Sequence, residues 1–146
     1  MAPTDDIDAL YVALKRLTPK VRRDRRLPSP PALTTTVTSP ECGSRIELDA
    51  LFENGQVQDI GYRVRACSLG QAATAILIDH ATGLQQAELQ RVRGQLEALL
   101  QNGRGHCDWP ELEVFAPASD IPNRHESVLL PFRALEQLFD LTHADS

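Results

Sequence analysis

Two of the three cysteines stand where a thiol could do chemistry. Cys42 lies in the segment 39–44 beside Pro40 and Gly43, and turns of this composition favour an accessible side chain. Cys67 follows a predicted strand and directly precedes a predicted helix, whose free N–H groups and partial positive charge favour a thiolate. Thiolate is the form that binds metals and attacks sulfur. The pair therefore indicates a metal or sulfur site, although inert packing of buried cysteines explains the same positions about equally well.

The elements that position these thiols follow from the spacing of apolar residues. A helical period predicts a helix over 5–17, and the proline-rich stretch up to residue 32 predicts a linker. Alternating or β-branched residues predict strands over 33–38, 44–52 and 57–66. Asn54-Gly55 is typical of a tight hairpin turn, because both residues tolerate positive φ. If the first and third strands are neighbours, both cysteines can emerge at one end of the sheet.

Apolar residues at helical spacing dominate the second half of the chain. Helices are predicted over 68–82, 86–101 and 127–141, with one or two helical turns in 109–115. Strands followed by helices are typical of the α+β class, so we expect a three-stranded antiparallel sheet with helices packed on one face. The predicted organisation is an N-terminal helix and basic linker over 1–32 and an α+β domain over 33–146.

Composition indicates a soluble protein of the reducing cytoplasm. The 146 residues fit one domain, and 42% hydrophobic with 24% charged residues suits a globular chain. No apolar run reaches the ~20 residues of a membrane helix, and the acidic residues 1–8 do not resemble a secretory signal. Three cysteines, an odd number, argue against a disulfide framework.

The charge is unevenly distributed. The net charge is −5, yet the segment 15–26 holds seven basic residues against the single acid Asp24. Such a cluster can indicate a nucleic-acid surface. We prefer a solvated linker that docks on an acidic body or partner, because the rest of the chain is acidic and no aromatic residue interrupts the arginines.

Three short motifs, in order, resemble those of the NifU/IscU-type iron–sulfur cluster assembly scaffolds. Residues 39–46 resemble the first motif, in which Pro-x-Cys-Gly-Asp precedes a strand. Residues 55–73 resemble the second, which runs from a turn through a strand to a cysteine and a helix of small residues. Its segment 70–73 is similar to a divergent bacterial branch of the family. Residues 124–129 align with the third, a His-Cys pair at the start of the last helix, so the resemblance covers residue 33 to the C-terminus.

The resemblance implies a SufE/IscU-like fold and a scaffold or carrier rather than an enzyme. Iron, sulfur or a transient iron–sulfur cluster would bind through Cys42 and Cys67, with His125 as a further ligand and Glu126 as a weaker candidate metal ligand. The implied partners are a cysteine desulfurase and recipient apoproteins, and a homodimer is compatible with the family. Neither a membrane nor a nucleic-acid partner is expected.

Two departures from the family pattern change the expected ligand set. Ser44 stands where the family has an aspartate, and Glu126 stands where it has the third cysteine. Two thiolates, an imidazole and a carboxylate suit zinc at least as well as a cluster, which normally has four ligands, mostly thiolates. A second chain or an external thiol could complete a cluster. The alternatives are a zinc-bound sulfur-transfer protein and a metal-free interaction protein on the same fold.

The remaining candidate residues receive structural interpretations. Cys107 follows His106 in a glycine-rich loop, and we expect an exposed, incidental thiol unless the loop folds toward Cys42. His80 is expected to be structural and Trp109 a core anchor. The chain shows no nucleophile elbow, Walker loop, HExxH motif or paired-carboxylate signature, which argues against a hydrolase.

Overall fold

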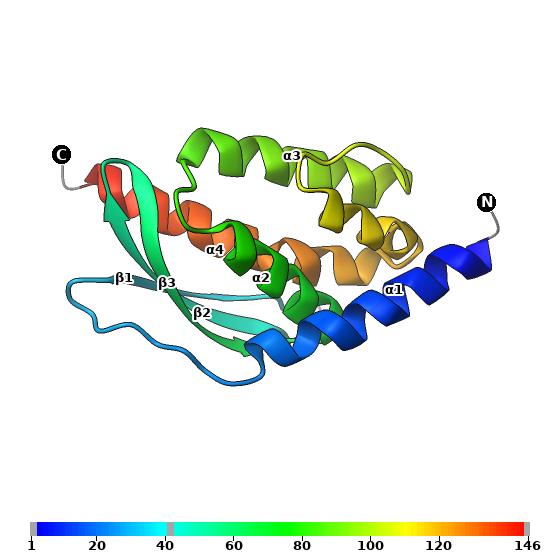
Figure 1. Ribbon diagram of the computed structural model, residues 1–146, viewed down its shortest axis with the longest axis horizontal. Coiled ribbons are helices and arrows are strands. Elements are labelled where there is room, and N and C mark those ends of the chain that lie inside the picture. The colour runs from blue at the N-terminus through cyan, green and yellow to red at the C-terminus, as the bar shows by residue number, and fades with distance from the viewer. Residues whose placement is uncertain (1–2, 41–42, 145–146) are drawn as a thin grey trace.

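The computed structural model describes residues 3–40 and 43–144, so Cys42 lies outside the described residues. Its three strands form one antiparallel sheet in the order β1-β2-β3 (Figure 1). The strands are β1 (Leu33–Thr38), β2 (Arg45–Glu53) and β3 (Gln56–Arg65). Each bound lies within one residue of the prediction, because the alternation of apolar and polar residues marks strands of this kind clearly.

The hairpin turn between β2 and β3 is confirmed. Asn54 and Gly55 both have positive φ, 55° and 77°, as a tight turn requires. The register then shifts between Leu51 and Phe52, where β3 contributes an extra residue and forms a bulge. The buried residues of the two strands nevertheless stay on one face, with Leu48 opposite Tyr62.

The helices gather on one face of the sheet, as predicted (Figure 1). They are α1 (Pro3–Leu17), α2 (Ser68–His80), α3 (Gln86–Asn102) and α4 (His125–Ala144), with 3-10 segments η1 (Thr18–Val21), η2 (Pro110–Asp120) and η3 (Pro122–Arg124). Helix α4 packs on β1, β2 and α2, while α3 lies outside it against η2. The core between these layers includes Ile46, Ile76 and Phe132, which are all fully buried.

Several helices differ in extent from the prediction: α1 begins two residues earlier, and α4 begins two residues earlier and ends three residues later. The late segment is an eleven-residue 3-10 helix, η2, rather than one or two turns, and it contains Pro117, which cannot donate an α-helical hydrogen bond. Helix α2 ends two residues early, because the following loop pairs with the start of β3. The Gly83 N–H donates to the Val57 carbonyl at 2.8 Å, and the Val57 N–H donates to the Leu84 carbonyl at 3.0 Å.

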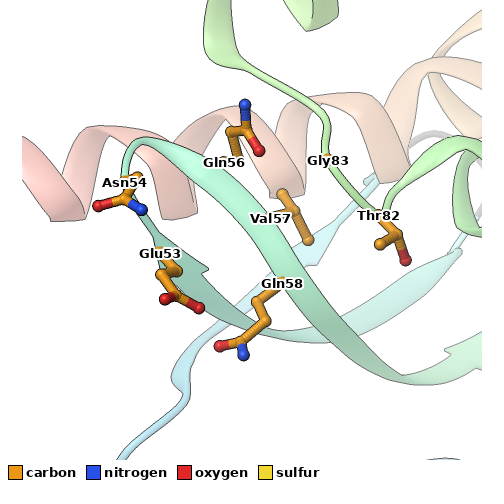
Figure 2. A pocket seen from close by; sticks show the side chains of 7 residues that line it. All are labelled: Glu53, Asn54, Gln56, Val57, Gln58, Thr82 and Gly83. Carbon is orange, nitrogen blue, oxygen red and sulfur yellow. The ribbon is translucent and has the colours of Figure 1, made fainter.

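A cavity of about 220 Å³ lies where this loop meets the hairpin turn (Figure 2). One acidic residue and several neutral ones line it: Glu53, Asn54, Gln56, Val57, Gln58, Thr82 and Gly83. Within the part of the chain that the structure describes, no cysteine or histidine lines it. It lies at the start of β3, whereas Cys67 follows the other end of that strand, so this cavity is separate from the predicted cysteine site.

The outer face of the sheet is crossed by residues 22–32, which we call the strap. Arg25 pairs with Tyr62 at the edge of β3, and its N–H donates to the Tyr62 carbonyl at 2.9 Å. The strap then passes directly over Gly61, where an added Cβ would lie 2.7 Å from the Arg25 carbonyl oxygen and 2.8 Å from the Leu27 nitrogen. Only glycine permits this close approach.

The N-terminal helix belongs to the same hydrophobic core as the sheet. Leu10, Ala13, Leu17 and Val21 are buried in one cluster with residues of β2, α2 and α4. The predicted boundary after residue 32 is not tested by this packing and stays a prediction. None of the described helices combines the length and the apolar character needed to cross a membrane.

Candidate functional site

Of the two cysteines at the predicted site, Cys67 is the one that the structure describes. It is the residue that immediately precedes α2, and its side chain is half-buried and makes no capping hydrogen bond to that helix. Its Sγ lies 3.1 Å from the Oγ of Ser127, in the first turn of α4. The thiol therefore sits beside the open start of α2, where unpaired backbone N–H groups favour negative charge.

Ser127 connects the three predicted motifs. Its side chain is fully buried, and its Oγ lies 3.1 Å from the Oγ of Ser44 as well as 3.1 Å from Cys67 Sγ. Ser44 comes two residues after Cys42 and just before β2. Segments from the first, second and third motifs thus meet at one buried hydroxyl. The sequence interpretation gave no role to Ser127, although a small polar residue within an otherwise apolar helix face was a usable signal.

Gly70 allows α2 to approach the start of α4 this closely. A Cβ on Gly70 would lie 2.5 Å from Ser127 Oγ, 2.9 Å from the Ala66 Cβ and 3.2 Å from the Ser127 carbonyl oxygen. Contacts this short would force the two helices apart. The small residues of α2 that resembled the family motif therefore serve a packing purpose beside Cys67.

The described residues on either side of Cys42 are joined by backbone hydrogen bonds. The Ser39 N–H donates to the Ser44 carbonyl at 2.8 Å, and the Gly43 N–H donates to the Ser39 carbonyl at 2.8 Å. Gly43 has a φ of 71°, a conformation that favours glycine. Because Cys42 itself lies outside the described residues, its role as a ligand stays a prediction.

His125 is the first residue of α4 and is partly buried. Its Nε2 lies 2.8 Å from the Ala118 carbonyl oxygen, so that this nitrogen donates the hydrogen bond. In a neutral imidazole the Nδ1 then carries the free electron pair. Metal-binding histidines commonly fix their ring through such a bond to a carbonyl. This arrangement is compatible with the predicted ligand role.

Glu126 points toward a different neighbour. Its Oε2 lies 3.6 Å from the Arg133 Nε, and both side chains line a cavity of about 150 Å³ together with His125. Cys67 does not line that cavity. Within residues 3–40 and 43–144, no three His, Cys, Asp or Glu side chains form a group that could hold a metal ion. The ligand set that includes Glu126 therefore stays a prediction.

The expectation of an exposed Cys107 is wrong. The residue is fully buried in the core, and its backbone N–H donates to Glu113 Oε2 at 3.4 Å. Burial, assisted by the nearby carboxylates of Glu113 and Asp108, raises the pKa of the Cys107 thiol to about 11. The loop was misjudged because its glycines and charges mark its exposed residues, while Cys107 turns inward beside Trp109.

Trp109 anchors the late segment in the core, as predicted. It is buried, and its ring stacks on His80 with centroids 4.2 Å apart and an angle of 5°. His80 Nε2 lies 2.7 Å from Glu111 Oε2, which leaves the imidazole committed to structural contacts. These residues join η2 to α2 and lie outside the site around Cys67.

Comparisons with known proteins agree in both sequence and fold. No family model matches the chain. It is 21% identical over 103 residues to the iron–sulfur cluster assembly scaffold protein IscU of Streptococcus pyogenes serotype M1, an alignment that covers 69% of this chain and 65% of that protein. The chain thus spans just under two thirds of the length of this curated relative.

Solved structures extend the similarity to nearly the whole chain. The N-terminal part of a nitrogen-fixing NifU-like protein from Brucella abortus superposes with a TM-score of 0.87 at 26% identity, covering 97% of this chain and 99% of that one. A scaffold assigned to the SUF system of Fervidobacterium islandicum AW-1 superposes with a TM-score of 0.75 at 18% identity, covering 87% and 93%. The resemblance indicated by the three motifs is therefore confirmed: the chain is similar in sequence and in fold to NifU/IscU-type proteins.

Proposed function

We propose that this chain is an iron–sulfur cluster assembly scaffold or carrier that binds iron, sulfur or a transient cluster through Cys42 and Cys67. It would take sulfur from a cysteine desulfurase and pass its cargo to recipient apoproteins in the cytoplasm, without turnover chemistry of its own. His125 would be an auxiliary ligand, and Glu126 a further one.

The observation that carries this proposal is the meeting of the three motifs at Ser127. The buried hydroxyl lies 3.1 Å from both Cys67 Sγ and Ser44 Oγ, so the thiol, the turn after Cys42 and the start of α4 share one hydrogen-bonded centre. A hydroxyl and an open helix start can both stabilise a thiolate or a sulfur atom attached to it. The similarity to the Brucella abortus NifU-like domain supports the same role.

The donor set fits a labile cargo better than a permanent one. A cluster normally has four ligands, mostly thiolates, whereas this chain offers two thiolates, one imidazole and one carboxylate. Glu126 would first have to leave Arg133, its ion-pair partner at 3.6 Å. Weak completion of the site suits a protein that must release what it binds. The same donors suit zinc, which is the competing outcome of the test.

The test is anaerobic purification followed by measurement of iron, sulfide and zinc per chain. Reconstitution with iron, cysteine and a desulfurase would then be compared between the wild type, the Cys42→Ser/Cys67→Ser variant and the Cys107→Ala variant. Cys107→Ala is the matched control, because it removes a buried thiol outside the site.

We expect stoichiometric iron and sulfide in the wild type and in Cys107→Ala, and neither in the double variant. If the wild type holds zinc but no sulfide, and the double variant holds no zinc, the result would favour a zinc-bound sulfur-transfer protein over a scaffold. If the wild type and the double variant both stay free of metal and sulfide, the scaffold proposal is wrong, and a metal-free interaction protein on this fold is the remaining interpretation.

A further inference from the structure

Three arginines form a charged surface on the outer face of the sheet. Arg45 begins β2, and Arg63 and Arg65 lie near the end of β3. Together with Glu47 they line a cavity of about 140 Å³, and each guanidinium side chain is about half exposed. We call Arg45, Arg63 and Arg65 the arginine surface.

The register of the sheet brings two of these positive charges together, which destabilises the fold. Arg45 lies directly opposite Arg65 in the β2–β3 pair. Like charges in directly opposed positions destabilise a sheet, and uncharged or opposite-charge pairs would serve the fold better. The fold alone therefore gives no reason for this pair, which suggests that the charges serve an interaction.

Two nearby carboxylates, Asp24 and Glu47, neutralise the three arginines only in part. Asp24 accepts hydrogen bonds from Arg65, the shorter at 3.0 Å, and lies 3.6 Å from the Arg63 Nε. Glu47 lies 3.3 Å from Arg45 but is also bound by Arg26. Among the described residues, Arg45 and Arg63 make ion pairs without a hydrogen bond of good geometry, so their donors can turn to a partner.

The strap adds positive charge beside the arginine surface. It crosses the outer face over Gly61, two residues before Arg63. Two further exposed arginines, Arg22 and Arg23, directly precede Asp24. A chain of net charge −5 therefore presents a locally positive surface.

The arginine surface adjoins the cysteine end of the sheet. Arg45 comes three residues after Cys42, and Arg65 comes two residues before Cys67. A partner that docks there would lie next to Cys67, and complementary charge would speed and orient its approach.

We propose that the arginine surface docks a carboxylate-rich segment of the protein that exchanges sulfur or a cluster with the neighbouring cysteines. The inference rests on the proposed function only for the identity of that partner. Guanidinium groups bind carboxylates in paired geometry, and half-exposed arginines at a shallow cavity can reach an extended acidic segment. Among residues 3–40 and 43–144, no aromatic side chain lines the cavity to stack on bases, which disfavours nucleic acid.

The test uses a fluorescein-labelled ten-residue peptide of alternating Glu and Asp, with a Gln/Asn peptide of the same length as the uncharged control. Binding to the full chain is measured by fluorescence anisotropy at 50 mM and 300 mM NaCl. The variant Arg45→Gln/Arg63→Gln is compared with Arg91→Gln/Arg104→Gln, which removes the same charge from exposed positions on and after α3. A ten-nucleotide single-stranded DNA is the third probe, and thermal melts verify that both variants fold.

We expect the acidic peptide to bind at 50 mM NaCl and to weaken several-fold at 300 mM, because salt screens exposed charges. Arg45→Gln/Arg63→Gln should weaken it at least fivefold, while the α3 variant should bind within twofold of the wild type. Absence of binding at 50 mM NaCl, equal losses in both variants, or equal binding of the neutral peptide would overturn the proposal. If the DNA binds more tightly than the acidic peptide, and this binding is lost in Arg45→Gln/Arg63→Gln, the partner of the arginine surface is a nucleic acid and not an acidic protein. None of these results depends on metal, sulfur or a desulfurase, so the proposed function is tested separately.

Discussion

Cys67 and Cys107 lie in opposite environments, and the difference decides which thiol can react. Cys67 is half-buried at the start of a helix, beside the hydroxyl of Ser127. Cys107 is enclosed by the core, with its pKa raised by burial and by two nearby carboxylates. A reactive or metal-binding cysteine must be accessible to its partner, and of these two thiols only Cys67 is partly exposed.

Iodoacetamide should therefore distinguish the two thiols. With a pKa of about 11, roughly one Cys107 in a thousand is a thiolate at pH 8. We expect mass spectrometry of peptides to show Cys67 labelled in the native protein, and Cys107 labelled only after unfolding in guanidinium. Native labelling of Cys107 at the rate of Cys67 would contradict its enclosure.

Among the elements, the contact between the starts of α2 and α4 holds the site together. Gly70 is the residue that permits it, because the serine hydroxyl of α4 occupies the space of a Cβ. The strap is the second element that matters, since it covers the outer face of the sheet through one buried carboxylate, Asp49.

Gly70→Ala should destabilise the protein by ~1–2 kcal/mol, because overpacking against Ser127 outweighs the gain in helix propensity. The matched control is Gly94→Ala in α3, where an added Cβ meets nothing within 4 Å. That variant should gain ~0.5–1 kcal/mol. Urea unfolding measures both, and a stabilised Gly70→Ala would show that the helices can separate without cost.

Asp49→Asn should release the strap. The carboxylate is fully buried and accepts hydrogen bonds from Arg26 at 2.8 and 2.9 Å, from the Leu27 N–H at 3.0 Å and from Thr34 Oγ1 at 2.7 Å. An asparagine would turn N–H groups toward these donors, so we expect a loss of ~2–3 kcal/mol in urea unfolding. Asp59→Asn, which removes an exposed carboxylate bound to Arg25, should cost less than ~1 kcal/mol.

Asp49 should also make the free energy of unfolding depend on pH. Burial opposes ionisation of Asp49, but the hydrogen bonds from Arg26, Leu27 and Thr34 outweigh it and hold the pKa of the carboxyl below its ordinary value. A lowered pKa stabilises the folded state above the unfolded value, ~3.9, and this contribution is lost as the pH falls through the folded value. The stability gap between wild type and Asp49→Asn should therefore narrow as the pH falls from 5 to 3.

At the scale of the whole molecule, one core joins the N-terminal helix to the α+β body. Leu10, Leu17 and Val21 are buried in the same cluster as the sheet and α2. The strap that follows is bound through Arg25 and Arg26 to the sheet, so that residues 1–32 and 33–146 share both apolar and polar contacts.

Removal of residues 1–32 should therefore lower the melting temperature by at least ~10 °C, because several large apolar side chains lose their burial partners. Tyr11→Ser is the matched control, since that side chain is 61% exposed on α1, and its melting temperature should stay close to that of the wild type. Circular dichroism melts measure both. An unchanged melting temperature after truncation would show that 33–146 folds independently.

The strands, most of the helices and the α+β class could be predicted from the sequence, because these depend on local periodicity and on turn residues such as Asn54-Gly55. The sequence also determined the family resemblance, which rests on short motifs around Cys42, Cys67 and His125. Which residues of these motifs contact one another could be seen only in the tertiary structure. Local patterns do not encode which distant side chains meet, so the role of Ser127, the burial of Cys107 and the anchoring of the strap by Asp49 were decided by tertiary packing alone.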